Sequence, residues 1–216
     1  MKKAVCLLSG GPDSATAAAV AKRDGYEVHC LTFDYGQIAS RELESAKLVA
    51  KKLGVKLKTM DLSSLKGLYG SGVTALTDAR MKMPERFEAS VIVPFRNGVM
   101  LSIAAAYAVA IGANAIYYGA QKDDSPFYPD CRSDFADAMS DAISCGTERK
   151  IRVKNPLARL GKSDVIRLAS EAKVPLELTW SCYLNGPLHC GRCESCRNRK
   201  KAFREAGLED PTEYAV

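Results

Sequence analysis

The sequence has 216 residues, 47% of them apolar and 26% charged, and its 31 Lys and Arg residues against 25 Asp and Glu residues give a net charge of +6. Such a chain can bury the core of one large domain with a small appendage, and its modest charge permits an anionic ligand without requiring a nucleic-acid partner. No run approaches the roughly 18 uninterrupted apolar residues of a membrane span, and the start lacks a secretory signal. We therefore expect a cytoplasmic protein with no membrane partner.

Strand and helix patterns alternate along the chain. Apolar runs predict strands at residues 3–8, 26–33, 55–60, 115–118 and 151–153. An alanine-rich helix is expected from Ala15, amphipathic helices after Ser40 and around residues 135–143, and a helix buried against the sheet over the apolar residues 99–111. The alternation predicts an α/β fold, a doubly wound, mainly parallel five-stranded sheet with ligands at the carboxyl ends of its strands.

Residues 63–90 interrupt this alternation with glycines at 67, 70 and 72, Pro84 and mixed charges. A loop of this length in a compact domain is either a lid that orders on binding or a plain surface insertion, and the sequence leaves both readings open. We predict two units. An α/β domain spans residues 1–175 and includes this excursion, and a C-terminal region spans residues 176–216.

The segment Ser-Gly-Gly-Pro-Asp-Ser at residues 9–14 joins the first predicted strand to the first predicted helix. Paired glycines at such a junction leave backbone N–H groups directed at one point at the positive end of the helix dipole, where anions bind. The segment lacks the Lys followed by Ser or Thr of a Walker loop. It resembles instead the loop of the PP-loop ATP pyrophosphatase superfamily, which implies cleavage of ATP to AMP. The alternative is a Gly-Gly turn capped by Asp13 or Ser14.

Four of the eight cysteines lie close together near the C-terminus with the spacing C-x7-C-x2-C-x2-C; they are Cys182, Cys190, Cys193 and Cys196. Four soft ligands at this spacing match a closed tetrahedral zinc site. A redox pair, an iron–sulfur cluster or a site in which His189 replaces one thiolate are the alternatives. The basic residues at 192–204 either neutralise the thiolates or contact RNA or phosphate. We expect four sulfur ligands and one structural zinc ion.

Two polar segments fall at the predicted strand ends beside the glycine loop, Val-Pro-Phe-Arg-Asn-Gly at residues 93–98 and the proline-containing residues 123–132. The second alternates carboxylate, hydroxyl, aromatic and guanidinium groups, which is typical of a binding site. Arg96 is suited to bind a carboxylate or phosphate, and Asp123 or Asp130 to accept two hydrogen bonds from a guanine-like edge. Alternatively, Asn97 caps a helix and Arg132 pairs with Asp134. The candidate substrate-binding residues are Arg96, Asn97, Asp123, Tyr128, Asp130 and Arg132.

Taken together, the motifs at residues 9–14, 33–37, 94–98, 128–132 and 179–196 resemble the 7-cyano-7-deazaguanine synthase family, QueC, over nearly the whole chain. The resemblance implies an adenine nucleotide alpha hydrolase-like, Rossmann-like fold with a small C-terminal zinc-binding helical appendage. It further implies a cytosolic homodimeric ligase that converts 7-carboxy-7-deazaguanine, ammonia and ATP into the nitrile preQ0 for queuosine biosynthesis. One departure is that Ile38-Ala39-Ser40 stand where the family commonly has a basic pair, and Arg41 comes later.

The resemblance also implies roles for individual residues. The four cysteines become the zinc ligands, and residues 8–18 become the ATP-binding segment: Leu8, Ser9, Gly10, Gly11, Pro12, Asp13, Ser14, Ala15, Thr16, Ala17 and Ala18. AMP transfer activates the carboxylate and then the amide, while Ser9, Ser14, backbone N–H groups and magnesium stabilise the departing pyrophosphate. Asp13 orients the loop or holds the magnesium ion. Neither histidine is an obvious base partner for Cys131, so covalent catalysis is not expected.

Two other functions stay open on the sequence alone. A tRNA-thiolating or otherwise tRNA-modifying PP-loop ATPase would use the cysteines for sulfur relay or a cluster. A zinc-dependent RNA-binding protein without catalysis would bind tRNA in a salt-dependent manner without ATP turnover. A glutamine-dependent amidotransferase fits less well, because 216 residues leave no room for a glutaminase domain.

Overall fold

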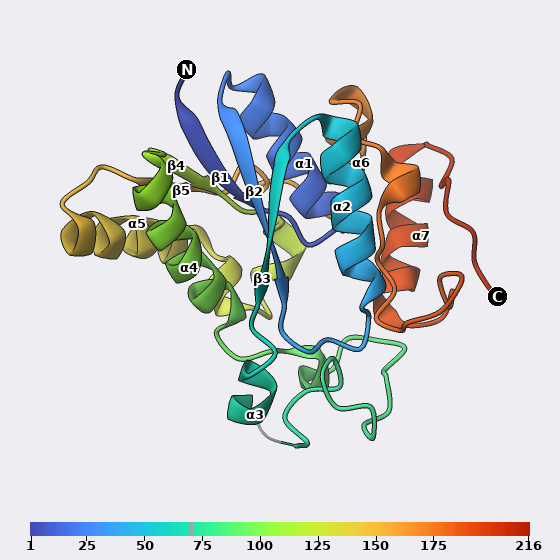
Figure 1. Ribbon diagram of the computed structural model, residues 1–216. Coiled ribbons are helices and arrows are strands. Elements are labelled where there is room, and N and C mark those ends of the chain that lie inside the picture. Colours follow the sequence, from blue (N-terminus) through green and yellow to red (C-terminus); the bar gives the residue numbers. More distant parts are fainter. Residues whose placement is uncertain (70) are drawn as a thin grey trace.

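The computed structural model describes residues 1–69 and 71–216; Gly70, in the predicted excursion, lies outside the described residues. A five-stranded sheet with the order β3-β2-β1-β4-β5 forms the centre (Figure 1). All four strand pairings are parallel. Each predicted strand is confirmed, with its ends shifted by no more than one residue; the strands are β1 (Lys3–Leu7), β2 (Glu27–Asp34), β3 (Lys56–Asp61), β4 (Ala115–Tyr117) and β5 (Arg152–Lys154).

Helices cover both faces of the sheet, which confirms the predicted doubly wound architecture. On one face lie α1 (Pro12–Arg23), α2 (Arg41–Leu53) and α6 (Lys162–Glu171), and on the other lie α4 (Arg96–Ile111) and α5 (Ser133–Thr147). The C-terminal α7 (Glu194–Ala206) packs on α6. Since the order of strands reverses between β1 and β4, the crevice at their carboxyl ends is the expected ligand site of such a sheet.

The apolar helix α4 packs against the sheet as predicted, through Leu101, Ala104 and Ala108, which are fully buried. Only one side of the helix is buried in this way, since Ser102 and Ala106 are exposed. Together with the preceding 3-10 turn, the stretch Ala89–Ile111 is long and apolar enough to cross a membrane by length and composition alone; 33% of its apolar 18-residue window is buried inside the protein.

The described part of the predicted excursion lies across the carboxyl ends of the strands (Figure 1). It begins with the short helix α3 (Leu65–Tyr69). Two of its carbonyls accept backbone hydrogen bonds from other parts of the chain. Ile38 N–H, just after β2 in the sequence, donates to the Leu76 carbonyl (2.9 Å), and Glu194 N–H, at the start of α7, donates to the Pro84 carbonyl (3.2 Å). An ion pair of 2.7 Å between Arg197 and Glu85 adds to this second attachment. The segment therefore connects the β2 end to α7 over the crevice, and we call it the cover.

Arg199, one of the basic residues at 192–204, is buried inside the protein with 1% of its surface exposed. Its guanidinium donates to the Leu176 carbonyl (2.9 Å), Thr179 Oγ1 (2.8 Å) and Asp210 Oδ1 (3.2 Å). These bonds fasten α7 to the segment before it and to the chain after it. Because it is buried, Arg199 cannot contact RNA, which was one of the two explanations for the basic run. The domain boundary near residue 175 stays a prediction.

Candidate active site

The loop at residues 9–14 is held in shape by its two serines. Ser14, which is 8% exposed, accepts the Ser9 N–H at Oγ (3.1 Å), and its hydroxyl donates to the Gly11 carbonyl (3.0 Å). The Ser9 hydroxyl lies 3.0 Å from Ser14 Oγ and accepts the Gly11 N–H (3.3 Å). Gly11 is the N-cap residue of α1 and provides no side-chain cap. Of the two residues expected to cap the turn in the alternative reading, Ser14 does bond its backbone, through the Ser9 N–H and the Gly11 carbonyl.

Two glycines let neighbouring segments approach this loop closely. Gly10 has a φ of +97°, and a Cβ there would lie 2.3 Å from the backbone oxygen of Glu42 in α2. Gly119, just after β4, would place a Cβ 2.6 Å from the backbone oxygen of Asp13. Only a residue without a side chain fits at either position. The loop is therefore clamped between α2 on one side and the end of β4 on the other.

Asp13 forms an ion pair with Lys162, the first residue of α6, and the two side chains are only 20% and 23% exposed. The other carboxylate oxygen, Asp13 Oδ1, is buried and has no hydrogen-bond partner within residues 1–69 and 71–216. A buried polar atom without a partner costs about 1–3 kcal/mol, so this oxygen is a natural contact for a bound group. Lys162 was not among the predicted site residues, because its position beside the loop depends on the fold.

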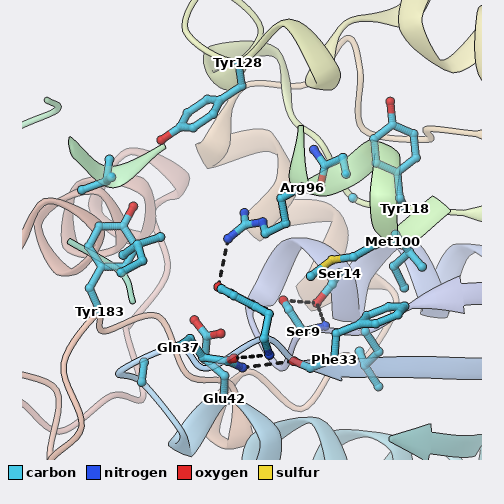
Figure 2. Close-up of a pocket in the computed structure, with 18 residues that line it drawn as sticks. Ser9, Ser14, Phe33, Gln37, Glu42, Arg96, Met100, Tyr118, Tyr128 and Tyr183 are labelled. Carbon is cyan, nitrogen blue, oxygen red and sulfur yellow. Dashed lines mark hydrogen bonds between the residues drawn. The ribbon is translucent and has the colours of Figure 1, made fainter. Parts of the chain in front are cut away.

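The first cavity, of about 210 Å³, lies between the loop, the end of β2 and the start of α4 (Figure 2). Its apolar lining is Leu7, Leu8, Phe33, Leu76, Val91 and Met100. Its polar lining includes the two loop serines, Gln37, Glu42 and Arg96. An apolar lining with a few polar groups is typical of a small-molecule site, although the volume is below the roughly 300–1,000 Å³ of most such sites.

The second cavity, of about 800 Å³, is more strongly charged and lies under the cover. Asp13, Lys162, Asp123 and Asp124 line it, as do Glu85, Arg86 and Phe87 of the cover and Glu194 and Arg197 of α7. Burial raises the pKa of Asp124 to about 6, partly offset by the charge of Lys162. Four residues belong to both linings, so the two cavities meet along a common wall: Arg96, Asn97, Tyr128 and Tyr183.

Arg96 occupies the centre of this common wall. Its Nη1 donates to the Tyr35 hydroxyl (3.0 Å), and its guanidinium lies 5.5 Å from the centroid of the Tyr35 ring. Burial raises the pKa of Tyr35 to about 12 despite the nearby positive charge, so the phenol is neutral and Arg96 keeps its charge. The guanidinium faces both cavities and is suited to bind an anionic group of a ligand.

Asp123 and Asp130, which we predicted to accept hydrogen bonds from a guanine-like edge, instead accept backbone N–H groups in the first turns of two helices. Asp130 Oδ2 accepts the Asn97 N–H (3.0 Å), so Asp130, and not the predicted Asn97, caps α4. Asp123 Oδ2 accepts the Lys162 N–H (2.9 Å) at the start of α6. Both still line the second cavity, together with Tyr128. Arg132 lies outside both linings and donates to the Ser125 carbonyl (3.0 Å) instead of pairing with Asp134.

Other predicted residues divide clearly between the cavities and the core. Leu8, Ser9 and Ser14 line the first cavity and Asp13 the second. Ala15, Thr16, Ala17 and Ala18 are fully buried in α1, where no ligand can touch their side chains. Burial raises the pKa of Cys131 to about 12, with Asp130 adding to the rise. The thiol is therefore protonated at neutral pH, in keeping with the expectation that it is not a nucleophile.

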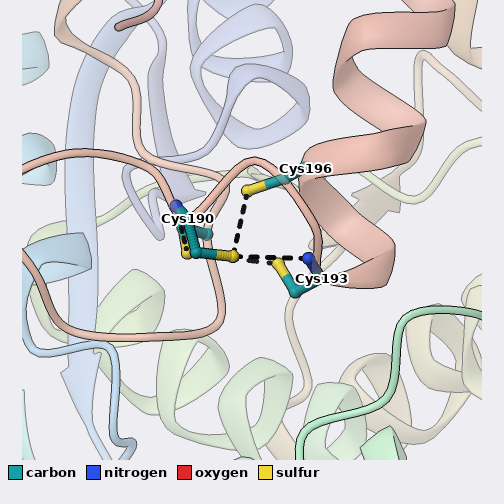
Figure 3. A group of neighbouring side chains, drawn as sticks. Cys190, Cys193 and Cys196 are labelled. Carbon is teal, nitrogen blue, oxygen red and sulfur yellow. Dashed lines mark hydrogen bonds between the residues drawn. The ribbon is translucent and has the colours of Figure 1, made fainter. Parts of the chain in front are cut away.

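The four predicted metal ligands come together, with their sulfur atoms all within 4.8 Å of one another. Figure 3 shows the Cys190, Cys193 and Cys196 side chains converging on one point. The Cys190 and Cys196 sulfurs are 3.9 Å apart and those of Cys193 and Cys182 are 4.0 Å apart, close to the ~3.8 Å expected for sulfurs about 2.3 Å from a tetrahedral zinc. His189, the alternative to one thiolate, does not belong to the group of ligand atoms that come together, and its Nε2 accepts the Ser181 N–H (3.0 Å).

The cysteine cluster is directly connected to the glycine loop. Trp180 N–H donates to the Gly10 carbonyl (3.0 Å), and its indole N–H donates to the Cys182 carbonyl (2.8 Å). The Trp180 ring packs against the His189 ring at 4.2 Å between centroids. One tryptophan thus joins the segment with the four clustered cysteines to the loop that faces the first cavity.

Comparison with known proteins identifies the family of this chain. A family model described as "Queuosine biosynthesis protein QueC" matches residues 3–207. A 7-cyano-7-deazaguanine synthase of Thermoplasma acidophilum is 47% identical over 99% of this chain and 92% of its own length, and one of Campylobacter fetus is 45% identical over 99% and 98%. A 4-thiouridine synthetase solved as an RNA complex with bound ATP shares the fold, with a TM-score of 0.55, 20% identity and coverage of 95% of this chain and 50% of that one. The match of the family model over nearly the whole chain, with full-length relatives at this identity, shows that the chain belongs to the QueC family.

Proposed function

We propose that this enzyme is an ATP-dependent carbon–nitrogen ligase that converts 7-carboxy-7-deazaguanine and ammonia into 7-cyano-7-deazaguanine, preQ0, in queuosine biosynthesis. The family and the name shared by its full-length relatives support the product. One observation carries the mechanism. The loop serines and the Arg96 guanidinium line the same cavity, so an anion held by Arg96 can meet a phosphate held by the loop.

The nucleotide would occupy the first cavity and the loop. The apolar residues of the cavity would pack against the purine base, while backbone N–H groups at the start of α1 would bind the phosphates. The ammonium of Lys162, held beside the loop by Asp13, adds the positive charge that a Walker lysine would otherwise supply. The related fold of a 4-thiouridine synthetase solved with ATP supports this assignment.

The deazaguanine acid would approach from the second cavity, with its carboxylate on Arg96. Tyr128 and Tyr183 of the common wall offer aromatic faces to the ring system. Because Arg96 belongs to both linings, it can hold the carboxylate of the acid at the place where the α-phosphate arrives. This alignment removes much of the entropic barrier to reaction.

The chemistry then needs no protein nucleophile. An oxygen of the carboxylate attacks the α-phosphorus of ATP, and pyrophosphate leaves. Ammonia attacks the resulting acyl adenylate, AMP leaves, and loss of a proton gives the amide. The amide oxygen then attacks the α-phosphorus of a second ATP, and a second pyrophosphate leaves. Loss of this AMP with the remaining nitrogen-bound protons leaves the nitrile. Ser9, Ser14 and Lys162 would stabilise the charge that develops on the pyrophosphate.

Two metals belong to the proposal. Asp13, whose buried Oδ1 lacks a partner in the described parts of the chain, fits a role in holding the magnesium of Mg-ATP, which neutralises phosphate charge when bound. The four cysteines fit one zinc ion with a structural role, because all four ligands are sulfurs of the protein. Catalytic roles are thus assigned to Ser9, Asp13 and Ser14. We further propose, from the resemblance to the family, that the enzyme is a cytoplasmic homodimer.

The test is incubation with ATP, magnesium, ammonium and 7-carboxy-7-deazaguanine, followed by mass analysis of the deazaguanine and nucleotide products. We expect preQ0 and AMP, with two AMP formed for each nitrile. ADP as the nucleotide product would contradict the adenylation mechanism. Absence of the nitrile in the presence of zinc-loaded protein would contradict the function itself.

A further inference from the structure

Glu42 is a carboxyl group in the first cavity for which the mechanism above has no use. It lies in the first turn of α2 and is only partly accessible. Figure 2 shows its carboxyl group directed toward the open space between Gln37 and Arg96. Among the residues that the structure describes, it has neither a hydrogen-bond partner nor an ion-pair partner within 4.0 Å. Such an unpartnered carboxyl group in a cavity is available to a ligand.

The groups around Glu42 determine its protonation. Arg96 from α4 is the cation of the cavity, and the neighbouring phenols are Tyr35 after β2, Tyr118 after β4, and Tyr128 and Tyr183 of the common wall. Burial raises the pKa of Glu42 to about 7, against a smaller opposing effect of Arg96. A group that ionises near neutral pH can take up and release protons under working conditions.

Glu42 lies beside the loop to which the proposed function assigns the phosphates. Its backbone oxygen packs on Gly10, the second residue of the phosphate loop, and its side chain shares the cavity with Ser9 and Ser14. A carboxylate this near a phosphate site repels phosphate unless a cation or an N–H donor lies between them. Ammonium is such a cation, and ammonia bound at a carboxylate keeps its lone pair free for attack.

We propose that Glu42 binds ammonia in the first cavity and is the catalytic base of the amide-forming step. This inference rests on the proposed function. Ammonium transfers one proton to the Glu42 carboxylate, and the resulting ammonia forms a bond to the acyl carbon of the adenylate. The bond from that carbon to the AMP oxygen breaks, AMP leaves with the electron pair, and the surplus proton on nitrogen is released to solvent.

The experiment compares Glu42→Gln with the wild type in two half-reactions. Acid-dependent exchange of pyrophosphate into ATP reports adenylation, and amide formation reports attack by ammonia. We expect exchange to change less than threefold and ammonium-dependent kcat to fall about 100-fold or more, as on removal of a general base. Hydroxylamine, which is mostly unprotonated at neutral pH, should restore turnover to within about tenfold of the wild type, with the hydroxamate as product. Glu44→Gln, at an exposed position in the same helix, is the control.

Three results would overturn the inference. An equal loss in the exchange and amide-forming reactions would assign Glu42 to the nucleotide step. A rise confined to the KM of the acid would make it a contact of the deazaguanine ring. Unchanged ammonium dependence would remove it from the reaction. If the wild type itself gave no acid-dependent exchange, the proposed function would fail instead.

Discussion

At the scale of single residues, the loop at residues 9–14 has a charged partner that lies far away in the sequence. The loop has no lysine of its own, and the fold brings Lys162 from the start of α6 to Asp13. The pair therefore places one positive and one negative group at the same edge of the loop. Under the proposed function, Asp13 Oδ1, which has no partner in the described parts of the chain, would contact the cation that accompanies the nucleotide, and Lys162 would contact the phosphates.

We expect Asp13→Ala to reduce turnover by at least about 1000-fold while the fold stays intact. The partly exposed ion pair contributes only on the order of 1 kcal/mol to stability, so the melting temperature should shift by no more than a few degrees. Steady-state formation of preQ0 and thermal unfolding measure the two effects. Asp134→Ala, on exposed surface of α5, is the control, and near-normal turnover of Asp13→Ala would rule out the role assigned to Asp13.

The raised pKa of Glu42 predicts a pH-dependent effect on stability. A folded-state pKa of about 7 lies above the ordinary glutamate value of 4.5, so the folded protein binds the proton more tightly than the unfolded chain. The free energy of unfolding therefore decreases as pH rises from about 4.5 to 7, and above 7 the full penalty is present. Glu42→Gln removes that penalty. It should stabilise the protein by about 2–3 kcal/mol at pH 8 and by much less at pH 5.

Thermal or urea unfolding at both pH values tests this expectation. Glu44→Gln should show no comparable difference between pH 5 and pH 8, because its side chain is exposed. An equal gain for Glu42→Gln at both pH values would mean that ionisation of Glu42 is not the source of the effect.

At the scale of elements, the segment that carries the four clustered cysteines is bonded to the candidate active site. Trp180 joins it to Gly10, Arg199 joins α7 to the residues before Trp180, and the cover bonds to the start of α7. A disturbance of the cysteine cluster is therefore expected to reach the phosphate loop. This arrangement explains why a structural metal would matter for nucleotide binding without touching the nucleotide.

We expect Cys193→Ser to abolish metal binding and weaken nucleotide affinity at least about tenfold, since structural zinc sites contribute on the order of 10 kcal/mol in small peptides. Metal content by mass spectrometry and binding of a fluorescent ATP analogue measure the two effects. Cys145→Ser changes an exposed cysteine of α5 and should leave both unchanged. Full metal content in Cys193→Ser would contradict the four-sulfur site.

The sequence predicts elements better than it predicts side-chain partners. Strand and helix positions follow from periodicity, and the cysteine cluster follows from spacing, so both could be found without a structure. The capping roles of Asp123 and Asp130 could not, because each carboxylate binds a backbone N–H more than 30 positions away. No feature of the sequence around Glu42 distinguishes it from an exposed glutamate of a helix, and only the folded chain places it in a cavity.

At the scale of the whole molecule, the site lies at the carboxyl ends of β1 and β4, which are neighbours in the sheet. Loops that follow these two strands touch at Gly119 and Asp13. A side chain on Gly119 would not fit at this contact, because its Cβ would also lie 3.0 Å from the Ser14 N atom. The geometry of the phosphate loop thus depends on the packing of the entire sheet.

Gly119→Ala should displace the loop, lower nucleotide affinity at least about tenfold and reduce stability by about 1–3 kcal/mol, as expected of overpacking. Gly146→Ala is a matched control, because a Cβ there meets no atom within 4 Å. Nucleotide titration and chemical unfolding of both variants check the expectation. Normal nucleotide affinity in Gly119→Ala would mean that the loop adjusts freely.

The common wall of Arg96, Asn97, Tyr128 and Tyr183 links the occupants of the two cavities thermodynamically. A ligand that binds in one cavity and fixes these side chains also fixes part of the wall of the other cavity. Any factor by which the nucleotide tightens binding of the acid must then equal the factor by which the acid tightens binding of the nucleotide. The enzyme would therefore hold its two substrates with reciprocal cooperativity, whichever of them arrives first.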